Sequence, residues 1–102
     1  MRKIDPWDVY EFLTTIPAGK VVTYGTIAKH LGNKNFARTV GNILHQNPDG
    51  NKYPCYKVVT ASGKLAENYA FGGIKKQKEL LEKDGIAVNG DKVDLKKYGW
   101  NI

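Results

Sequence analysis

The stretch NPDGNKYPCYKVV, residues 47–59, holds the only cysteine of the chain, Cys55, directly after a proline and shortly before two valines. Proline fixes its own φ and pushes the preceding residue toward extended geometry, so we expect Cys55 to leave a tight bend and to lead into a short strand. A lone cysteine in a small domain is more often a small buried hydrophobic residue than a reactive one. Since no Cys/His/Asp constellation is visible nearby, both interpretations of Cys55 stay open at this point.

Length and composition favour one folded domain over residues 1–102, with a single modest core. A content of 41% hydrophobic and 25% charged residues is typical of a globular chain. One cysteine excludes an internal disulfide framework, which agrees with a reducing compartment. The start of the chain turns acidic at Asp5, and no apolar run is long enough for a bilayer, so we expect a cytoplasmic, nucleoid or nuclear protein without a membrane partner.

The charge balance points to a polyanionic partner. Sixteen Lys and Arg residues against ten Asp and Glu give a formal net charge of +6, and nucleic acid is the first candidate for such a small basic surface. A soluble basic protein without such a partner is the alternative. No metal-ligand cluster is visible, so we expect no metal and no other cofactor, and we expect a monomer.

Two helices are predicted before residue 33. The first starts at Asp5-Pro6, an N-cap followed by proline at the first helical position, and ends at Pro17-Ala18-Gly19. After a short extended piece at Val21-Val22, Thr23 can cap the second helix, which Gly32-Asn33 ends. The residues at helical spacing in the first helix are Val9, Phe12, Leu13 and Ile16.

A third helix is predicted over about residues 35–46, and together with the second it forms a helix-turn-helix signature. In such a pair the later helix is the one offered to a DNA groove. Its expected inward side chains are Phe36, Val40, Ile43 and Leu44, and its expected outward ones are Arg38, Thr39, Asn42 and His45.

The outward face of this third helix carries small polar residues and one arginine, whereas a helix that reads the major groove usually offers several long hydrogen-bonding side chains. We therefore expect a close approach to the ligand. Gly41 agrees, because glycine inside a helix costs about 0.5–1 kcal/mol relative to alanine. Packing between helices at Gly41 explains it equally well.

The second half predicts a hairpin turn at residues 60–65, a glycine-rich loop at 67–73 that can wall a pocket, and an amphipathic helix at 74–84 closed by Gly85. A terminal hairpin follows, with strands at 86–88 and 92–95 and a type I′ turn at Asn89-Gly90. The order of elements predicts an α+β, mostly helical, winged-helix-like domain with a helix-turn-helix and a short terminal hairpin. The outward lysines of the amphipathic helix, most simply a solvated face, are Lys75, Lys76, Lys78 and Lys83.

Four motifs in this order carry a family resemblance: IPAGKVVTYG at 16–25, ARTVG at 37–41, NP at 47–48 and PCYKVV at 54–59. They resemble the C-terminal domain of the O6-alkylguanine-DNA alkyltransferases, also called methylated-DNA-protein-cysteine methyltransferases. The resemblance covers nearly the whole chain, without the family's separate N-terminal domain. In size the chain is similar to the alkyltransferase-like proteins, which carry a tryptophan in place of the cysteine, whereas this chain keeps Cys55.

The resemblance implies a DNA repair protein that binds duplex DNA in the minor groove and flips O6-alkylguanine out of the stack. Alkylation weakens pairing, so a damaged guanine is cheaper to extrude. In the family the cysteine thiolate, a strong soft nucleophile, then takes the alkyl group irreversibly. We therefore expect a single-turnover methyltransferase acting through Cys55. The alternative is an alkyltransferase-like protein that binds the lesion without transfer.

Matching positions imply roles in DNA binding. Tyr24 would push on the phosphate and help to rotate the nucleotide, while Arg38 would insert into the duplex and fill the vacated space. Gly41 would let the third helix sit close in the minor groove. The resemblance adds three more positions to this DNA-binding set, namely Gly25, Asn33 and Ala61.

The resemblance also implies a guanine pocket and a catalytic set around Cys55. Asn47 would brace the bend and hydrogen-bond near the thiol. The pocket would be lined by the backbone of Cys55 and Val58, with Tyr69 and Ala70. The pocket loop is one residue longer than is usual in the family and has alanine in place of a common serine.

This chain departs from the family at the residues that deprotonate the thiol. In the family a histidine follows the cysteine and works with a water and a glutamate from the late helix; here the matching positions are Tyr56 and Asp84, which we take as catalytic candidates. Tyrosine, with a reference pKa of about 10 against about 8.5 for cysteine, cannot act as a base at neutral pH. Activation would then depend on a helix N-terminus, on Lys57, or on hydrogen bonds from Asn47 and Tyr56.

Three hypotheses follow: an alkyltransferase, a damage-sensing protein that leaves its thiol intact, and a winged-helix regulator whose affinity follows DNA sequence and ignores the lesion. Mass and binding measurements on damaged and undamaged duplexes separate them.

Overall fold

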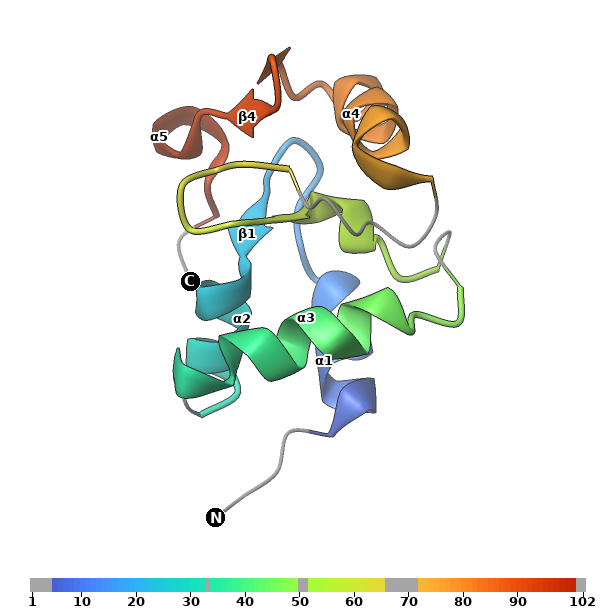
Figure 1. Cartoon of the computed structure of the whole chain (residues 1–102), viewed down its shortest axis with the longest axis vertical. Helices are drawn as coiled ribbons and strands as arrows, with labels where there is room; N and C mark the ends of the chain where they lie inside the picture. Colours follow the sequence, from blue (N-terminus) through green and yellow to red (C-terminus); the bar gives the residue numbers. More distant parts are fainter. Residues whose placement is uncertain (1–4, 33, 50–51, 66–71, 101–102) are drawn as a thin grey trace.

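The computed structural model describes residues 5–32, 34–49, 52–65 and 72–100, and it confirms the predicted α+β, mostly helical domain with a terminal hairpin (Figure 1). The elements in chain order are α1 Pro6–Leu13, β1 Val22–Thr23, α2 Tyr24–His30, the 3₁₀ turn η1 Lys34–Phe36, α3 Ala37–His45, the 3₁₀ turn η2 Cys55–Lys57, β2 Val58–Val59, α4 Gly73–Lys83, β3 Val88–Asn89, β4 Lys92–Val93 and α5 Leu95–Tyr98.

Both predicted N-caps are confirmed. The Asp5 carboxylate accepts a hydrogen bond of 2.9 Å from the backbone N–H of Trp7, and the Thr23 hydroxyl accepts one of 3.1 Å from Thr26. Helix α1 ends at Leu13, earlier than the apolar spacing predicts. The hydroxyls of the two threonines that follow bond back to carbonyls of the last turn, which competes with continued helix.

Helix α3 has the predicted faces. Its inward Val40, Ile43 and Leu44 are buried, and the predicted outward side chains, from Arg38 to His45, are exposed. The short 3₁₀ turn η1 precedes α3 in place of the predicted first helical turn. Helices α2 and α3 follow each other as expected, while their use as a DNA-binding pair stays a prediction.

Two short strands, far apart in the sequence, form the centre of the fold. Strand β1 pairs in parallel with β2, with Val22 opposite Val58 and Thr23 opposite Val59. Because successive side chains of a strand point to opposite faces, Val22 and Val58 join one buried cluster while Val21 and Val59 join the other. The β1–β2 pair therefore separates two hydrophobic cores. One is packed against α1, α2 and α3, and the other against α4 and the hairpin (Figure 1).

The terminal hairpin differs from the prediction in two respects. Asn89 pairs with Lys92, so the turn residues are Gly90 and Asp91, and among the described residues φ is positive only at glycines. A type I′ turn needs positive φ at both central positions, so that prediction is wrong. The second strand ends at Val93, because the Asp94 carboxylate accepts a hydrogen bond of 2.9 Å from the Lys96 N–H and caps α5, which the sequence did not predict.

Within the residues that the structure describes, none of the helices is long and apolar enough to cross a membrane.

Candidate functional site

Cys55 opens the 3₁₀ turn η2, so one helical turn separates it from the strand that it was expected to enter directly. Its backbone N–H donates to the Tyr53 carbonyl at 2.7 Å, which makes the bend after the proline tight. The residue is only 5% exposed and belongs to the first core cluster. Cys55 thus has the burial of a core residue, whereas reactive cysteines usually occupy partly exposed, electropositive surroundings.

Asn47 ties the end of α3 to this bend. Its side-chain amide donates to the Tyr53 carbonyl at 2.8 Å, the same oxygen that receives the Cys55 N–H, and its own oxygen accepts from the backbone N–H of Asp49 at 3.0 Å. Asn47 is buried. Its geometry is that of a brace on the backbone before Cys55, which agrees with the first of its two implied roles.

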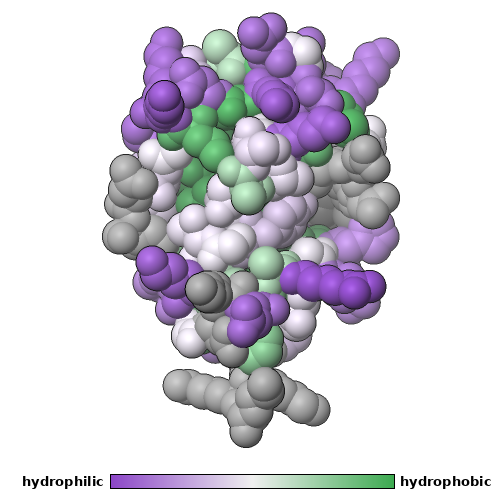
Figure 2. All heavy atoms as spheres, turned by 60° about the vertical axis from the view of Figure 1, so that its left-hand side comes forward, coloured by the Kyte–Doolittle hydropathy of each residue, from purple (hydrophilic) through white to green (hydrophobic). Residues whose placement is uncertain are grey.

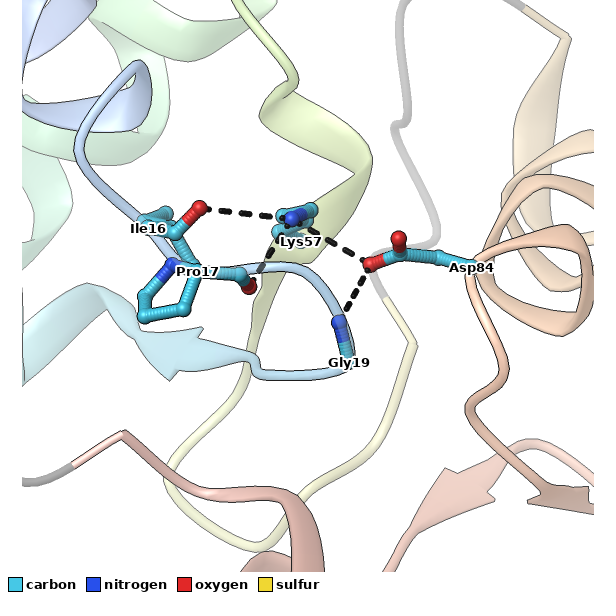
Figure 3. Close-up of polar contacts among 5 residues, drawn as sticks. All are labelled: Ile16, Pro17, Gly19, Lys57 and Asp84. Carbon is cyan, nitrogen blue, oxygen red and sulfur yellow. Dashed lines mark hydrogen bonds and ion pairs between the residues drawn. The ribbon is translucent and has the colours of Figure 1, made fainter.

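Lys57 and Asp84 form a buried ion pair, which Figure 3 shows. The Lys57 Nζ lies 3.2 Å from an Asp84 carboxylate oxygen, and the two side chains are only 7% and 17% exposed. The same nitrogen donates to the carbonyls of Ile16 and Pro17, at 3.4 and 3.1 Å. The same Asp84 oxygen accepts from the Gly19 N–H at 3.0 Å. Three separate segments are therefore joined at one point.

This ion pair occupies two positions that the sequence assigned to thiol activation. An ammonium group has three donors, and Lys57 has three acceptors around it in Asp84, Ile16 and Pro17. Asp84 likewise holds Lys57 and the Gly19 backbone. Lys57 and Asp84 therefore pair with each other, and their charges are neutralised in contacts that hold the fold together.

Tyr56, the third member of the expected relay, is half-buried. Burial raises the pKa of its phenol above the ordinary value, and the negative charge of Asp84 acts in the same direction. The phenol is therefore protonated at neutral pH and offers a donor, not a base.

Aromatic rings share the first core cluster with Cys55, Tyr10 as a buried member and Tyr24 and Tyr53 as partly buried ones. Burial raises the pKa of both Tyr24 and Tyr10, and a negative charge on Cys55 would act in the same direction. Tyr10 also stacks on Tyr53, with 5.4 Å between ring centroids, and its hydroxyl donates to the Ile43 carbonyl at 2.9 Å. Sequence reasoning missed Tyr10, although its place between Val9 and Phe12 could have indicated a buried position.

Gln77 is the second residue that sequence reasoning missed. It is fully buried on α4, and its amide donates to the carbonyls of Tyr56 and Val58 at 2.9 and 3.0 Å. These hydrogen bonds hold the backbone that follows Cys55, including Val58, which was expected to line a guanine pocket. The available signal was its position four residues before Leu81, on the apolar face of the helix.

The residues expected to face DNA are spread over α2, α3 and the turn at 60–65. Tyr24 and Gly25 begin α2, Arg38 is exposed on α3, and Ala61 is exposed on the turn. A Cβ at Gly41 would meet the Tyr24 ring at 3.9 Å, an ordinary contact, so helix packing does not require glycine there. Three expected site residues lie outside the described residues, namely Asn33, Tyr69 and Ala70. In the described part of the chain no group of three or more His, Cys, Asp or Glu side chains could hold a metal ion.

A helix pair with an exposed polar face lies beside a buried cysteine turn that is braced by Asn47. The family model "6-O-methylguanine DNA methyltransferase, DNA binding domain" matches residues 6–86, and the chain belongs to this family.

Its relatives within the family differ in length and description. The chain is 40% identical to a bifunctional methyltransferase/endonuclease of Picrophilus torridus, covering 99% of this chain but only 34% of that protein. It is 39% identical to a DNA base-flipping protein of Vibrio parahaemolyticus, covering 90% and 91% of the two chains. The crystal structure of Schizosaccharomyces pombe Atl1 with damaged DNA containing O6-carboxymethylguanine superposes with a TM-score of 0.88, at 29% identity, over 99% of this chain and all of that one.

These comparisons correct one expectation. The chain was expected to be a single-turnover methyltransferase, and this is wrong. It matches the base-flipping and alkyltransferase-like proteins along nearly their whole length, whereas it covers 51% of the Mycobacterium tuberculosis methyltransferase chain bound to DNA, at a TM-score of 0.74. The site geometry is compatible with this correction, because Lys57 and Asp84, two of the residues considered for thiol activation, pair with each other.

Proposed function

We propose that this chain is a DNA damage-recognition protein, which binds O6-alkylguanine in duplex DNA, rotates it out of the stack and leaves the alkyl group on the base. The observation that carries the proposal is the buried Lys57–Asp84 ion pair. It stabilises the segments around the cysteine turn while it removes both charges from thiol chemistry. The site could then hold a lesion in place, and Tyr56, at the position of the family's histidine, offers no base at neutral pH.

The exposed face of α3 supports a minor-groove approach. Apart from Arg38, most of its outward side chains are small and polar, which supports a close approach of the DNA backbone. Proteins that open a base step from the minor groove usually insert a side chain into it. Arg38 is exposed on the same helix, which supports its assignment to this role.

Retention of the alkyl group follows from the protonation states around the thiol. Transfer would form a sulfur–carbon bond and break the carbon–oxygen bond of the base, which requires a thiolate. Tyr56, in the place of the family's histidine, holds its proton at neutral pH. Acting on DNA, the protein would work in the cytoplasm and nucleoid, or in a nucleus.

Intact mass and binding affinity, measured on the same mixtures, test the proposal. The protein is incubated with a duplex containing one O6-methylguanine and with the unmodified duplex. We expect an unchanged mass, and binding to the damaged duplex at least about 10-fold tighter, since an unstable pair is cheaper to flip. Cys55→Ala should keep this preference.

Two outcomes would overturn the proposal. A mass gain of one methyl group, mapped to Cys55, would show transfer. Equal affinity for damaged and undamaged duplexes, with a dependence on sequence, would identify a winged-helix regulator instead.

Arg38 provides a further test of base flipping. Arg38→Ala should weaken binding to a damaged duplex more than binding to a single strand with the same base, because only the duplex has a vacated space to fill. Lys29→Ala, which removes an exposed cation on α2, is the matched control. It should weaken binding to the damaged duplex and to the single strand by the same factor. Equal losses for Arg38→Ala would remove its role as the inserted side chain.

A further inference from the structure

Basic side chains gather at one end of the molecule, away from α3. Figure 2 shows strongly hydrophilic side chains at the end that holds α4, α5 and the hairpin, above a paler band. Four lysines of this end belong to the hairpin, to α5 and to the neighbouring turn, and we call them the hairpin surface: Lys64, Lys92, Lys96 and Lys97. Helix α1, by contrast, carries Asp8 and Glu11 and no lysine or arginine.

The hairpin surface keeps like charges close together. Lys64 lies directly opposite Lys92 in an antiparallel bridge, and like charges in this position repel each other. Asp91 approaches Lys64 at 3.8 Å, with both side chains half exposed, so it offsets little of the repulsion. No ion pair among the described residues engages the other three lysines. Asp91 and the exposed Asp94 lie on the same surface, so the four lysines leave an excess of two positive charges, which is available to an external anion.

The hairpin surface is continuous with an expected DNA contact. The turn at 60–65, which exposes Ala61, is hydrogen-bonded to the hairpin through Val93 N–H to Gly63 O at 2.9 Å and Leu65 N–H to Asp91 O at 2.8 Å. The approach is close enough that any side chain at Gly63 would collide with the Val93 carbonyl oxygen. The turn and the hairpin are thus one rigid unit.

We propose that the hairpin surface binds the phosphate backbone of the same duplex, beyond the segment contacted by α3. This rests on the proposed function. The longest dimension of the molecule is 39 Å, so α3 and the hairpin surface lie less than about 11 base pairs apart along a duplex, at 3.4 Å for each base pair. One molecule can therefore contact two sets of phosphates within about one helical turn, the set near the lesion through α3 and a set beyond it through these lysines. The contact adds affinity without reading the lesion.

The test is the salt dependence of binding for K92Q/K96Q/K97Q, on a 20-base-pair duplex with one central O6-methylguanine and on its undamaged counterpart. The slope of log K against log salt should fall by about 1 for each lysine that contacts a phosphate, so by up to about 3. Affinity for both duplexes should drop by the same factor. On an 8-base-pair duplex centred on the lesion, the variant should equal the wild type.

The matched control is K75Q/K78Q/K83Q on α4, which removes the same charge from a solvated face. If both triple variants lower the slope equally, only net charge matters and the inference fails. It also fails if the hairpin variant loses its preference for the lesion. Absence of lesion preference in the wild type would instead contradict the proposed function, while the slopes on undamaged DNA would still measure the hairpin contact. K92Q alone, with an expected slope change of about 1, guards against misfolding of the triple variant.

Discussion

Two hydrophobic clusters meet at the β1–β2 pair, and their chemistry differs. The buried members of the second cluster are all aliphatic, and Tyr56 and Tyr98 only pack against it; the buried members are Val21, Val59, Leu65, Leu81, Ile86 and Val93. The first mixes aliphatic side chains with Cys55 and the rings of Tyr10, Tyr24 and Tyr53, several of them only partly covered. The candidate site therefore lies in the cluster that keeps polar groups near the surface, and the aliphatic cluster supports it from behind.

The buried ion pair should give the largest effect. Asp84→Ala leaves the Lys57 ammonium buried without its counter-charge, and we expect a loss of about 3–5 kcal/mol in the free energy of unfolding, measured with urea. Asp91→Ala, which breaks the half-exposed pair with Lys64, should cost at most about 1 kcal/mol. Similar losses for both would mean that the burial of the first pair has no energetic weight. Adding Lys57→Met to Asp84→Ala should recover part of the loss.

A substitution at Gln77 should show whether this residue affects only the stability of the fold or also the preference for the lesion. Gln77→Met keeps the volume but leaves the Tyr56 and Val58 carbonyls without their donor, which we expect to cost about 1–3 kcal/mol of stability. The preference of this variant for O6-methylguanine over guanine should also decrease, because the backbone at Tyr56 and Val58 is no longer held by hydrogen bonds from residue 77. Leu81→Ala, in the aliphatic cluster, is the control: it should cost about 2–5 kcal/mol and leave the preference intact. An unchanged preference in Gln77→Met would assign Gln77 to stability alone.

The smallest effect should appear at alkaline pH. Burial raises the pKa of Tyr10, Tyr24 and Tyr56 in the folded protein. As the pH rises past about 10, the unfolded chain loses these protons first, so folding stability decreases from there upward and is unaffected at pH 7. The urea midpoint should therefore fall between pH 9 and 11, and Tyr24→Phe should make the fall shallower. Ile86→Val, in the aliphatic cluster, should keep the wild-type slope.

Local chemistry was predictable from the sequence. The caps at Asp5 and Thr23, the inward and outward faces of α3 and the existence of a terminal hairpin each depend on residues a few positions apart. The tight bend at Cys55 could be expected for the same reason, since the proline before it restricts the backbone.

The contacts between distant segments were not predictable in this way. Lys57 and Asp84 are far apart in the sequence, and nothing local indicates that they pair. The same holds for β1 with β2, and for Gln77 with the backbone after Cys55. The hairpin turn was misplaced because Asn89 takes part in strand pairing and the glycine begins the turn. These long-range contacts decide what the candidate site can do.

The alternation of side chains between two cores along the β1–β2 pair also determines where this chain tolerates inserted residues. One residue inserted between Val21 and Val22 would shift the register with β2, so that these two valines could no longer face their separate cores. An insertion at Gly90–Asp91 would only enlarge an exposed loop. Natural insertions and grafted peptides should therefore be tolerated at the hairpin tip and be rare within Val21–Thr23.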